Sequence, residues 1–326
     1  MEIADNQVLE SAQRWVSAEI KQWSPAWLEN LARWLESDVA LVGDAAWGAQ
    51  IRDLVKLPIP DPLAWANRRI ELADGHWAIA GIRFRGRDVE KPFVDIIATS
   101  LPPEAARIEA LAEVLPHFED FAPLCLRVNI PESTLSAAEL SEAEDFHGDA
   151  ESELLIVASP IDEMKMRPHA LLFDATTLIP CSTHDAAELT AEIYGELAAS
   201  RPQLREWATP ADAQSLEEAA EQGLLFEIRV NGETAGIVAA ERQDAYGFTG
   251  FCMQEIALNA AHRGRSIGVA TLQHLVRALD AKPFDLLWGH IHPGNIPSLH
   301  NAQASGRKVV TSHVWITPTG YPGMPS

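Results

Sequence analysis

The chain has 326 residues, which is long enough for two domains that each bury a hydrophobic core. Its formal net charge of -22 argues against nucleic acid and anionic membranes as partners. No apolar run approaches membrane-spanning length and no leader-like segment opens the chain, so we expect a cytoplasmic protein. The three cysteines stand far apart and indicate neither a disulfide framework nor a zinc site.

The first half begins with helical patterns and continues with strands. Tryptophans are concentrated before residue 80, and the run 24–35 has helical spacing, so we expect these rings to pack in a core or between helices. Pro102 and Pro103 are suited to the first turn of a helix. The predicted elements are a strand at 76–84, a strand at 92–99, a helix at 103–115 and a strand at 124–130.

The middle of the chain marks a change of domain. Residues 132–153 are rich in Glu, Ser and Ala and predict an acidic helix or a connection. Two apolar runs follow, at 154–158 and 170–174. We place the boundary between them, which predicts an N-terminal domain of residues 1–165 and a C-terminal domain of residues 166–326.

The second half alternates helix and strand patterns clearly. Asn231-Gly232 is a strong type I′ hairpin signal, and Gly306 stands where a helix C-cap glycine would. The predicted elements are helices at 185–199, 211–222 and 266–280, a short helix that ends at Ser305, and strands at 224–230, 234–240, 251–258, 284–292 and 308–316. This order predicts an α/β fold with a mixed sheet.

The segment 261–270 carries the clearest chemical signal. It joins a predicted strand to a predicted helix through a turn that contains Gly264 and is flanked by Arg263 and Arg265. The first amides of a helix have no intrahelical partner, the macrodipole adds positive charge there, and glycine allows close approach. Because the rest of the chain is acidic, this basic turn predicts a phosphate-binding cradle.

The same turn also satisfies a competing motif. Gly264-Arg-Ser-Ile-Gly268 fits the G-x-S-x-G nucleophile elbow of α/β-hydrolases, with Ser266 as the nucleophile and His290, His292 or His313 as a possible base. An elbow serine normally follows its strand directly, whereas residues 259–263 intervene here. No His-Gly-Gly oxyanion loop occurs upstream, and little chain remains to supply an acid and a histidine.

From about residue 185 to 316 the chain resembles the GCN5-related N-acetyltransferase (GNAT) superfamily. The superfamily has an (Arg/Gln)-x-x-Gly-x-(Gly/Ala) signature between its fourth strand and third helix, matched by residues 263–268 with Ser266 in place of the middle glycine. A second feature, Asn-x-x-(Ala/Ser) at a helix start, is matched by Asn295 to Ser298, although Gly306-Arg307 follows where Gly-Phe is usual. The order of elements agrees throughout.

The resemblance implies a GNAT acyl-CoA N-acyltransferase fold with acetyl-CoA as co-substrate. Amides and side chains of the turn would hold the pyrophosphate, main-chain groups of the preceding strand would pair with the pantetheine arm, and an asparagine would contact its thioester end. The residues that would bind acetyl-CoA are Ile256, Ala257, Leu258, Arg263, Gly264, Arg265, Ser266, Ile267, Gly268 and Asn295.

The first half is predicted to be a degenerate second copy, which would make the fold tandem. Its strand 92–99, helix 103–115 and strand 124–130 have the same βαβ order, but no Arg-x-x-Gly-x-Gly turn joins the first two. Tandem members with one silent half exist in the superfamily. The silent half would serve as scaffold and wall of the substrate cleft.

Acetyl transfer to an amine needs a base, a polarised carbonyl and a proton for the thiolate. Glu255 is the candidate base because it lies on the strand that leads to the cradle, where burial would raise its pKa; a solvent-facing glutamate is the alternative. The position of the family's acid tyrosine holds Ala302. Ser298 is therefore the candidate acid, with His300 or Tyr321 as alternatives, unless the thiolate leaves unassisted.

His290 and His292 are spaced to share one face of a strand. They are candidates for metal ligands, general bases or substrate contacts, and the simplest interpretation is ordinary hydrogen-bonded histidines. Two histidines lack the third ligand of a catalytic zinc site, so we expect no metal.

These patterns predict an acetyl-CoA-dependent N-acetyltransferase in which a primary amine attacks the thioester directly. The acceptor is expected to be a small-molecule or peptide amine, and the acidic charge favours a cationic one. The alternatives are a serine hydrolase that uses Ser266 and a CoA-binding module without turnover. The sequence does not determine the oligomeric state.

Overall fold

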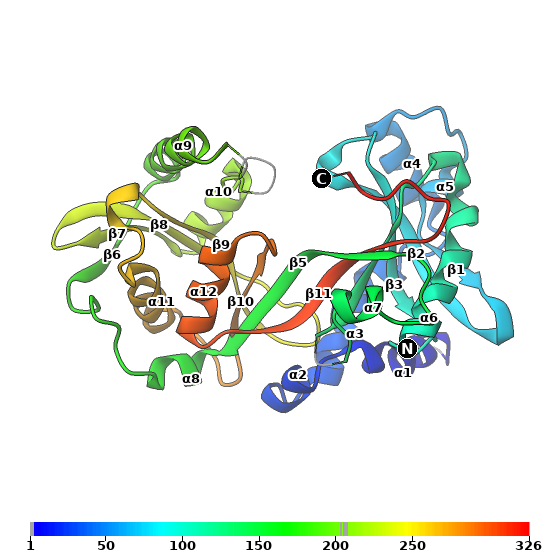
Figure 1. Cartoon of the computed structure of the whole chain (residues 1–326), viewed down its shortest axis with the longest axis horizontal. Coiled ribbons are helices and arrows are strands. Elements are labelled where there is room, and N and C mark those ends of the chain that lie inside the picture. The colour runs from blue at the N-terminus through cyan, green and yellow to red at the C-terminus, as the bar shows by residue number, and fades with distance from the viewer. Residues whose placement is uncertain (1–2, 133, 203, 205–207, 326) are drawn as a thin grey trace.

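One continuous sheet crosses the molecule in a computed structural model that describes residues 3–132, 134–202, 204 and 208–325. Its strand order is β1-β2-β3-β4-β11-β5-β10-β9-β8-β7-β6. Two lobes meet at a waist formed by the long strands β5 (Asp149–Pro160) and β11 (Lys308–Thr317), as Figure 1 shows. The mixed α/β sheet predicted from the sequence is confirmed.

The first half supplies the N-terminal helices, five strands and their connections. The predicted helix at 103–115 is instead a short α-helix that continues as a 3-10 helix, in which Pro116 lacks the amide that α-helical bonding needs. The elements are α1 (Ile3–Ala12), η1 (Gln13–Trp15), α2 (Ala18–Trp23), α3 (Trp27–Val39), α4 (Ala45–Val55), α5 (Pro62–Trp65), β1 (Arg68–Glu71), η2 (Ala73–Gly75), β2 (Trp77–Phe84), η3 (Arg85–Arg87), β3 (Pro92–Thr99), α6 (Ala105–Glu109), η4 (Ala110–Phe121), β4 (Leu126–Pro131), α7 (Ala137–Ser141) and β5.

The second half follows the predicted order closely. Asn231 and Gly232 both have positive φ (51° and 85°), as a type I′ turn requires, and Gly306 ends a helix with φ 102°. The elements are α8 (Ile161–Met166), β6 (Thr176–Pro180), α9 (Thr183–Ser200), α10 (Ala213–Glu221), β7 (Leu225–Val230), β8 (Glu233–Arg242), β9 (Gly250–Leu258), η6 (Ala260–His262), α11 (Ile267–Ala278), β10 (Leu286–Ile291), α12 (Ile296–Ser305) and β11.

The two halves repeat one strand arrangement and exchange their last strands. Along β1 to β4 the neighbours are antiparallel, antiparallel and parallel, and β7 to β10 repeat this series. Strand β5 of the first half pairs with β10, strand β11 of the second half pairs with β4, and the two pair with each other at the centre. Each half thus contributes a strand to the other half of the sheet, so the strand pairing does not divide the chain at one point. A domain boundary after residue 165 therefore stays a prediction.

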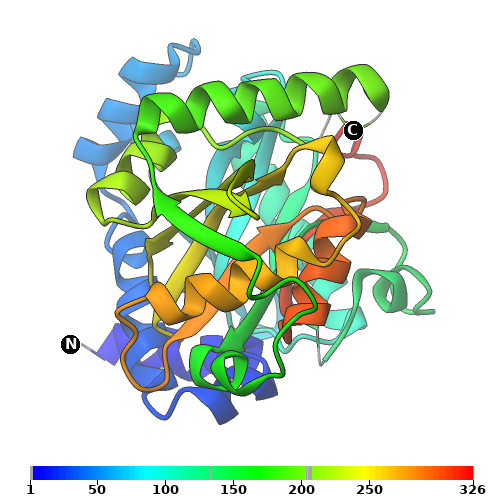
Figure 2. The ribbon, with the colours of Figure 1, turned by 90° about the vertical axis from the view of Figure 1, so that its left-hand side faces the viewer.

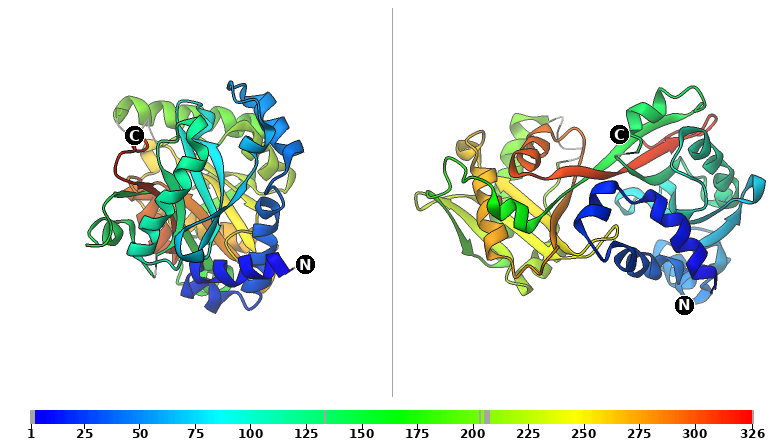
Figure 3. Two further views of the ribbon diagram at one scale, coloured as in Figure 1. Left: turned by 90° about the vertical axis from the view of Figure 1, so that its right-hand side faces the viewer. Right: turned by 90° about the horizontal axis from the view of Figure 1, so that it is seen from below.

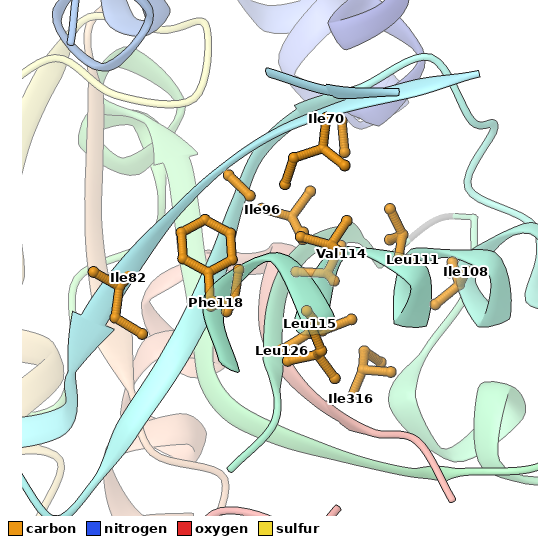
Figure 4. Close-up of a cluster of buried hydrophobic side chains, with 14 of the residues drawn as sticks. Ile70, Ile82, Ile96, Ile108, Leu111, Val114, Leu115, Phe118, Leu126 and Ile316 are labelled. Atoms are coloured by element: carbon orange, nitrogen blue, oxygen red, sulfur yellow. The ribbon is translucent and has the colours of Figure 1, made fainter. Parts of the chain in front are cut away.

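Separate cores lie on the two halves, and a third one joins them. In the first half, η4 packs Leu111, Val114 and Phe118 against the sheet (Figure 4). In the second half, α11 covers one side of β7–β9 and α9 the other, as the orange and green helices in Figure 2 show.

The joining core lies where α1–α3 pack beneath the waist, seen from below in Figure 3. Ile20 and Leu31 of these helices meet Tyr246, Phe248 and Trp288 of the second half. Each large apolar side chain that is fully buried contributes about 1.5–3 kcal/mol, so this core holds the halves together. None of the helices in the described ranges is both long and apolar enough to cross a membrane.

Candidate functional site

A gap opens where the parallel strands β9 and β10 diverge. They pair only from Gly250 to Cys252, opposite residues 286–288. Beyond that point residues 256–258 continue to pair with β8, and a register shift leaves Gln254 as an extra residue on β9. The edge of β9 that faces β10 therefore carries main-chain groups without a strand partner in the described part of the chain. These are main-chain groups of Ile256 and Leu258, which the resemblance assigned to the pantetheine arm. The carbonyl of Ala257, assigned to the arm as well, instead faces Gly236 of β8.

A concave run of amides lies directly after β9, at the start of α11. Gly264 and Ser266 have left-handed φ values of 71° and 60°, and Arg265 lies between them. Within the described residues, the backbone amides of 264–269 donate to no protein acceptor. Alternation of left-handed and other conformations makes a nest of converging N–H groups, and the helix N-terminus adds partial positive charge. This turn can bind an anion such as a pyrophosphate.

The side chains around this turn have distinct roles. Arg263 donates from Nε to the carbonyl of Leu258 at 2.8 Å, which fixes the turn to the end of β9. Arg265 and Ser266 are exposed, and the Ser266 hydroxyl caps no helix amide. Gly268 is buried, and a Cβ atom there would lie 2.7 Å from Oδ1 of Asn301. Gly268 thus permits α11 to approach α12, in addition to presenting its amide at the turn.

Glu255 is buried on β9 next to the gap, so the alternative of a solvent-facing strand glutamate is wrong. The residue is only 6 % exposed. Its Oε1 accepts from the hydroxyl of Tyr194 at 3.1 Å and from the amide of Ile256, and its Oε2 accepts from the amide of Ala211 at 3.0 Å. Burial raises the pKa of the Glu255 carboxyl, although these three donors act in the opposite direction.

His290 lies on the same side of the sheet as Glu255. Side chains alternate along a strand, and Leu287 packs toward α11, so His290 points to the opposite side. The residue is partly exposed to solvent, while its ring packs against Tyr246 and Trp288 and its Nε2 lies 3.1 Å from Tyr246 Oη. Burial among these groups, with the charge of Arg127, lowers the pKa of His290 to about 4.

A neutral imidazole beside the gap is a second candidate base. The sequence named His290 only as one of several possibilities, because its contact with Tyr246 is not visible in the spacing. His292 lies just beyond β10 and its Nδ1 accepts from the amide of Gly294 at 3.1 Å. The two histidines therefore have different partners.

Two other predicted site residues, Asn295 and Ser298, lie at the start of α12. Asn295 caps this helix, since its Oδ1 accepts from the amide of Ser298 at 3.2 Å. Ser298 lies in the first turn with its hydroxyl available, and Ala302 is buried. His300 is exposed, while Tyr321 packs against the core of the first half.

The described residues give the hydrolase interpretation no base. The hydroxyl of Ser266 makes no hydrogen bond to a histidine there, and His262, the nearest histidine in sequence, is bonded to Asn259. Across the same ranges, no cluster of three or more His, Cys, Asp or Glu could hold a metal ion.

The first half lacks both features at the equivalent positions. Strands β3 and β4 diverge after two pairs, and the register shift at Ile97 corresponds to that at Gln254. The next residue is then Ala98, where the second half has Glu255. The turn that follows contains Pro102 and Pro103, which have no amide hydrogen to donate. The first half therefore has neither the buried carboxylate nor the run of amides.

Comparison with known proteins agrees with this geometry in the second half. The family model described as "Acetyltransferase (GNAT) family" matches residues 186–306. None of the curated proteins matches the chain.

Several solved structures are similar at low identity. An acetyltransferase from the GNAT family of Colwellia psychrerythraea has 12% identity and a TM-score of 0.46, over 75% of this chain and 85% of that one. A GCN5-related N-acetyltransferase from Kribbella flavida has 14% identity and a TM-score of 0.46, over 86% and 97%. A tandem GNAT protein from the clavulanic acid biosynthesis pathway has 14% identity and a TM-score of 0.45, over 78% and 82%.

Proposed function

Because residues 186–306 form a domain of the acetyltransferase (GNAT) family, we propose that this protein is an acetyl-CoA-dependent N-acetyltransferase whose acceptor is a primary amine. The observation that carries the proposal is the run of unbonded amides at 264–269, which lies directly beyond the gap between β9 and β10. A nest of this kind fits a pyrophosphate, and the gap offers main-chain groups for an amide-containing arm.

The predicted binding residues fit acetyl-CoA, which would supply an activated thioester. The amides of residues 264–268 would hold the pyrophosphate, with Arg265 and the Ser266 hydroxyl as further donors. Arg263 would act mainly by fixing the turn to β9. Ile256 and Leu258 would hold the arm through their main chains, whereas the main-chain groups of Ala257 face β8. Asn295 would orient the first turn of α12 next to it, since its Oδ1 already caps that helix.

Glu255 is proposed as the proton acceptor for the attacking amine. Its raised pKa and its position on the gap strand support this role, and Tyr194 and Ala211 fix its orientation. A carboxylate of such low exposure would act through a water molecule. His290 is the rival, because it is partly exposed on the same side of the sheet and its lowered pKa keeps it unprotonated at neutral pH.

Ser298 is proposed to assist departure of the thiolate. It lies in the first turn of α12, which carries Ala302 where a tyrosine is usual. A thiolate is a good leaving group, so a hydrogen bond from the Ser298 hydroxyl to the departing sulfur is sufficient and no proton transfer from serine is needed. The acceptor would be a small-molecule or peptide amine, and the charge of -22 favours a cation over nucleic acid or an anionic membrane. A cytoplasmic location stays part of this proposal.

Calorimetric titration of the purified protein with acetyl-CoA tests the proposal. We expect saturable binding, followed by release of free thiol when amines are screened as acceptors. No binding at millimolar acetyl-CoA would refute the proposal. Binding without turnover across small amines and peptide N-termini would favour a CoA-binding module. Cleavage of a simple ester with labelling of Ser266 by a phosphonate would favour the hydrolase.

A further inference from the structure

The first half retains a partly open cavity at the place where its own strands diverge. The cavity has a volume of about 250 Å³ and lies between strands β3 and β4 on one side and α1, η1 and α3 on the other. Strand β3 contributes residues 96–99 to its wall, immediately after the last pair with β4. The cavity therefore occupies the counterpart of the gap in which the second half is proposed to hold a coenzyme arm.

A coenzyme does not suit this cavity. The turn after β3 has two prolines and Glu104 where the second half has its run of free amides. Two contacts also fix η1 across this turn, because Arg14 donates to the carbonyl of Ser100 and Trp15 to that of Leu101. A diphosphate would find neither donors nor an open path there, so the occupant must be a smaller molecule.

One end of the cavity is a paired-charge network. Arg127 donates from Nε and Nη2 to the two oxygens of Asp95, both at 2.9 Å, and from Nη1 to Glu153 at 3.4 Å. A guanidinium has five N–H groups, so the second N–H of each terminal nitrogen has no acceptor in the described residues. The side chains of Asp95 and Arg127 are 22% and 23% exposed, and both line the cavity.

Two further polar groups lie at this end. One ring nitrogen of His313 lies 2.9 Å from the hydroxyl of Tyr246, and its Nδ1 is buried 4.0 Å from Glu153 Oε2 without a hydrogen bond among the described residues. The side-chain amide of Asn129 lies 2.7 Å from the hydroxyl of Thr311, which also lies 3.0 Å from the carbonyl of Ile130. The single hydrogen of that hydroxyl serves one of the two acceptors, so the amide of Asn129 retains at least one N–H for a ligand.

Away from this network the lining is mainly apolar, although it includes Asp38, which is paired with Arg83. Trp15, Trp34, Leu31 and Leu35 form this part of the wall together with Ile96. A lone cation at the polar end would lie beside Arg127, and a lone anion would lie beside Asp95. A head group that carries both charges can instead place its ammonium at Asp95 and its carboxylate at Arg127 and Asn129, while an apolar body fills the far end.

We propose that the cavity of the first half is a binding site for a small amphiphilic zwitterion, namely an α-amino acid with an apolar side chain. The site is independent of the proposed transferase chemistry, because none of the cavity-lining residues belongs to β9, β10, α11 or α12. Its occupant would nevertheless touch Tyr246, whose hydroxyl is bonded to His290 beside the second gap.

Calorimetry without acetyl-CoA tests this site with L-leucine, L-methionine and L-phenylalanine as probes. Each is compared with its amide, which lacks the carboxylate, and with the matching acid that lacks the ammonium. We expect saturable binding of at least one zwitterion and a loss of about tenfold to a hundredfold for both single-charge analogues, because each lacks one charged hydrogen bond. The proposal would be overturned if none of the three amino acids binds at a concentration of about 20 mM. It would also be overturned if a single-charge analogue binds as tightly as its amino acid.

The triple variant Asp95→Asn, Arg127→Gln and Glu153→Gln neutralises the whole network. Glu153 is included because loss of Arg127 would otherwise leave this largely buried carboxylate without its ion pair. The fold is therefore expected to persist, and affinity for the bound zwitterion should fall by the same factor. The matched control is Glu227→Gln with Arg229→Gln, which neutralises an ion pair on β7 outside the cavity. Equal loss in the triple variant and in the control, or no loss in the triple variant, would contradict the assignment to this cavity.

Discussion

Two residues beside the second-half gap differ in how they could take a proton. Glu255 is held by Tyr194, Ala211 and its neighbour Ile256, which makes it rigid and nearly inaccessible. His290 is exposed and has a single bonded ring nitrogen. Both would act as bases in the unprotonated form. Burial raises the pKa of the Glu255 carboxyl and lowers the pKa of the His290 imidazole. The pH dependence of turnover can therefore distinguish them.

Replacement of Glu255 by Gln should lower kcat by about 10²- to 10⁴-fold, which is the usual contribution of a general base. If Glu255 is the base, the activity of the unaltered protein falls as the pH drops through its raised pKa, since the carboxyl gains a proton there. The Glu255→Gln variant should lose this acid limb and keep its affinity for acetyl-CoA. The measurement is the rate of thiol release as a function of pH.

His290→Gln is the matched control for that experiment. It should retain the acid limb, because the carboxyl would still titrate. Loss of the limb in this variant, with the limb intact in Glu255→Gln, would assign the base to His290 instead. Its lowered pKa of about 4 would then set the position of the limb.

At the scale of elements, the backbone conformation of the turn between β9 and α11 by itself arranges the amides that are proposed to bind the pyrophosphate. Ser266 adopts φ 60° and is exposed, and its side chain makes no hydrogen bond to the helix. A charge added here changes the electrostatics of the turn without disturbing a packed side chain. Gly268 is less suitable for such a test, because any side chain would collide with Asn301.

Ser266→Asp should weaken acetyl-CoA binding by at least about tenfold, because a carboxylate at the helix start competes for the same amides as the pyrophosphate. The fold should be kept, since aspartate is a favourable residue at this position. Ser266→Asn is the control, with the same shape and no charge, and should bind nearly as well as the unaltered protein. Calorimetry with both variants measures the difference. Equal affinities would contradict a phosphate-binding role of the turn.

Local patterns predict these elements well where neighbours in sequence determine them. The type I′ turn at Asn231-Gly232, the cap at Gly306 and the turn at 263–268 each depend on a few adjacent residues. The hydrogen bond between His290 and Tyr246 joins β10 to the loop between β8 and β9, so spacing along β10 could not reveal it. The paired charges of Asp95 and Arg127 likewise come from different strands.

The exchange of β5 and β11 could not be predicted for a similar reason. Both strands are extended and combine an apolar run with polar residues, and nothing in their own residues specifies which neighbour each will have. Only the assembled sheet shows that β5 lies between β10 and β11, and that β11 lies between β4 and β5. The predicted division at residue 165 would assign β5 to the first domain and β11 to the second. In the sheet, however, β5 pairs with β10 and β11 pairs with β4.

The whole molecule should therefore unfold as one unit. Without β11, the first half would expose one long edge of β4, and without β5 the second half would expose β10; such edges promote aggregation. We expect residues 1–165 and 166–326, expressed separately, to be largely insoluble or unfolded, and to form a folded complex only when expressed together. Circular dichroism of each fragment and of the mixture measures this.

Urea denaturation of the intact chain provides the complementary measurement. A single transition that has the same midpoint by tryptophan fluorescence and by circular dichroism is expected, because most tryptophans lie in the first half while both halves contribute helices. Two separate transitions, or a soluble folded fragment of either half, would contradict interdependence. Those outcomes would instead support independent domains, and the exchanged strands would then add little to the stability of the sheet.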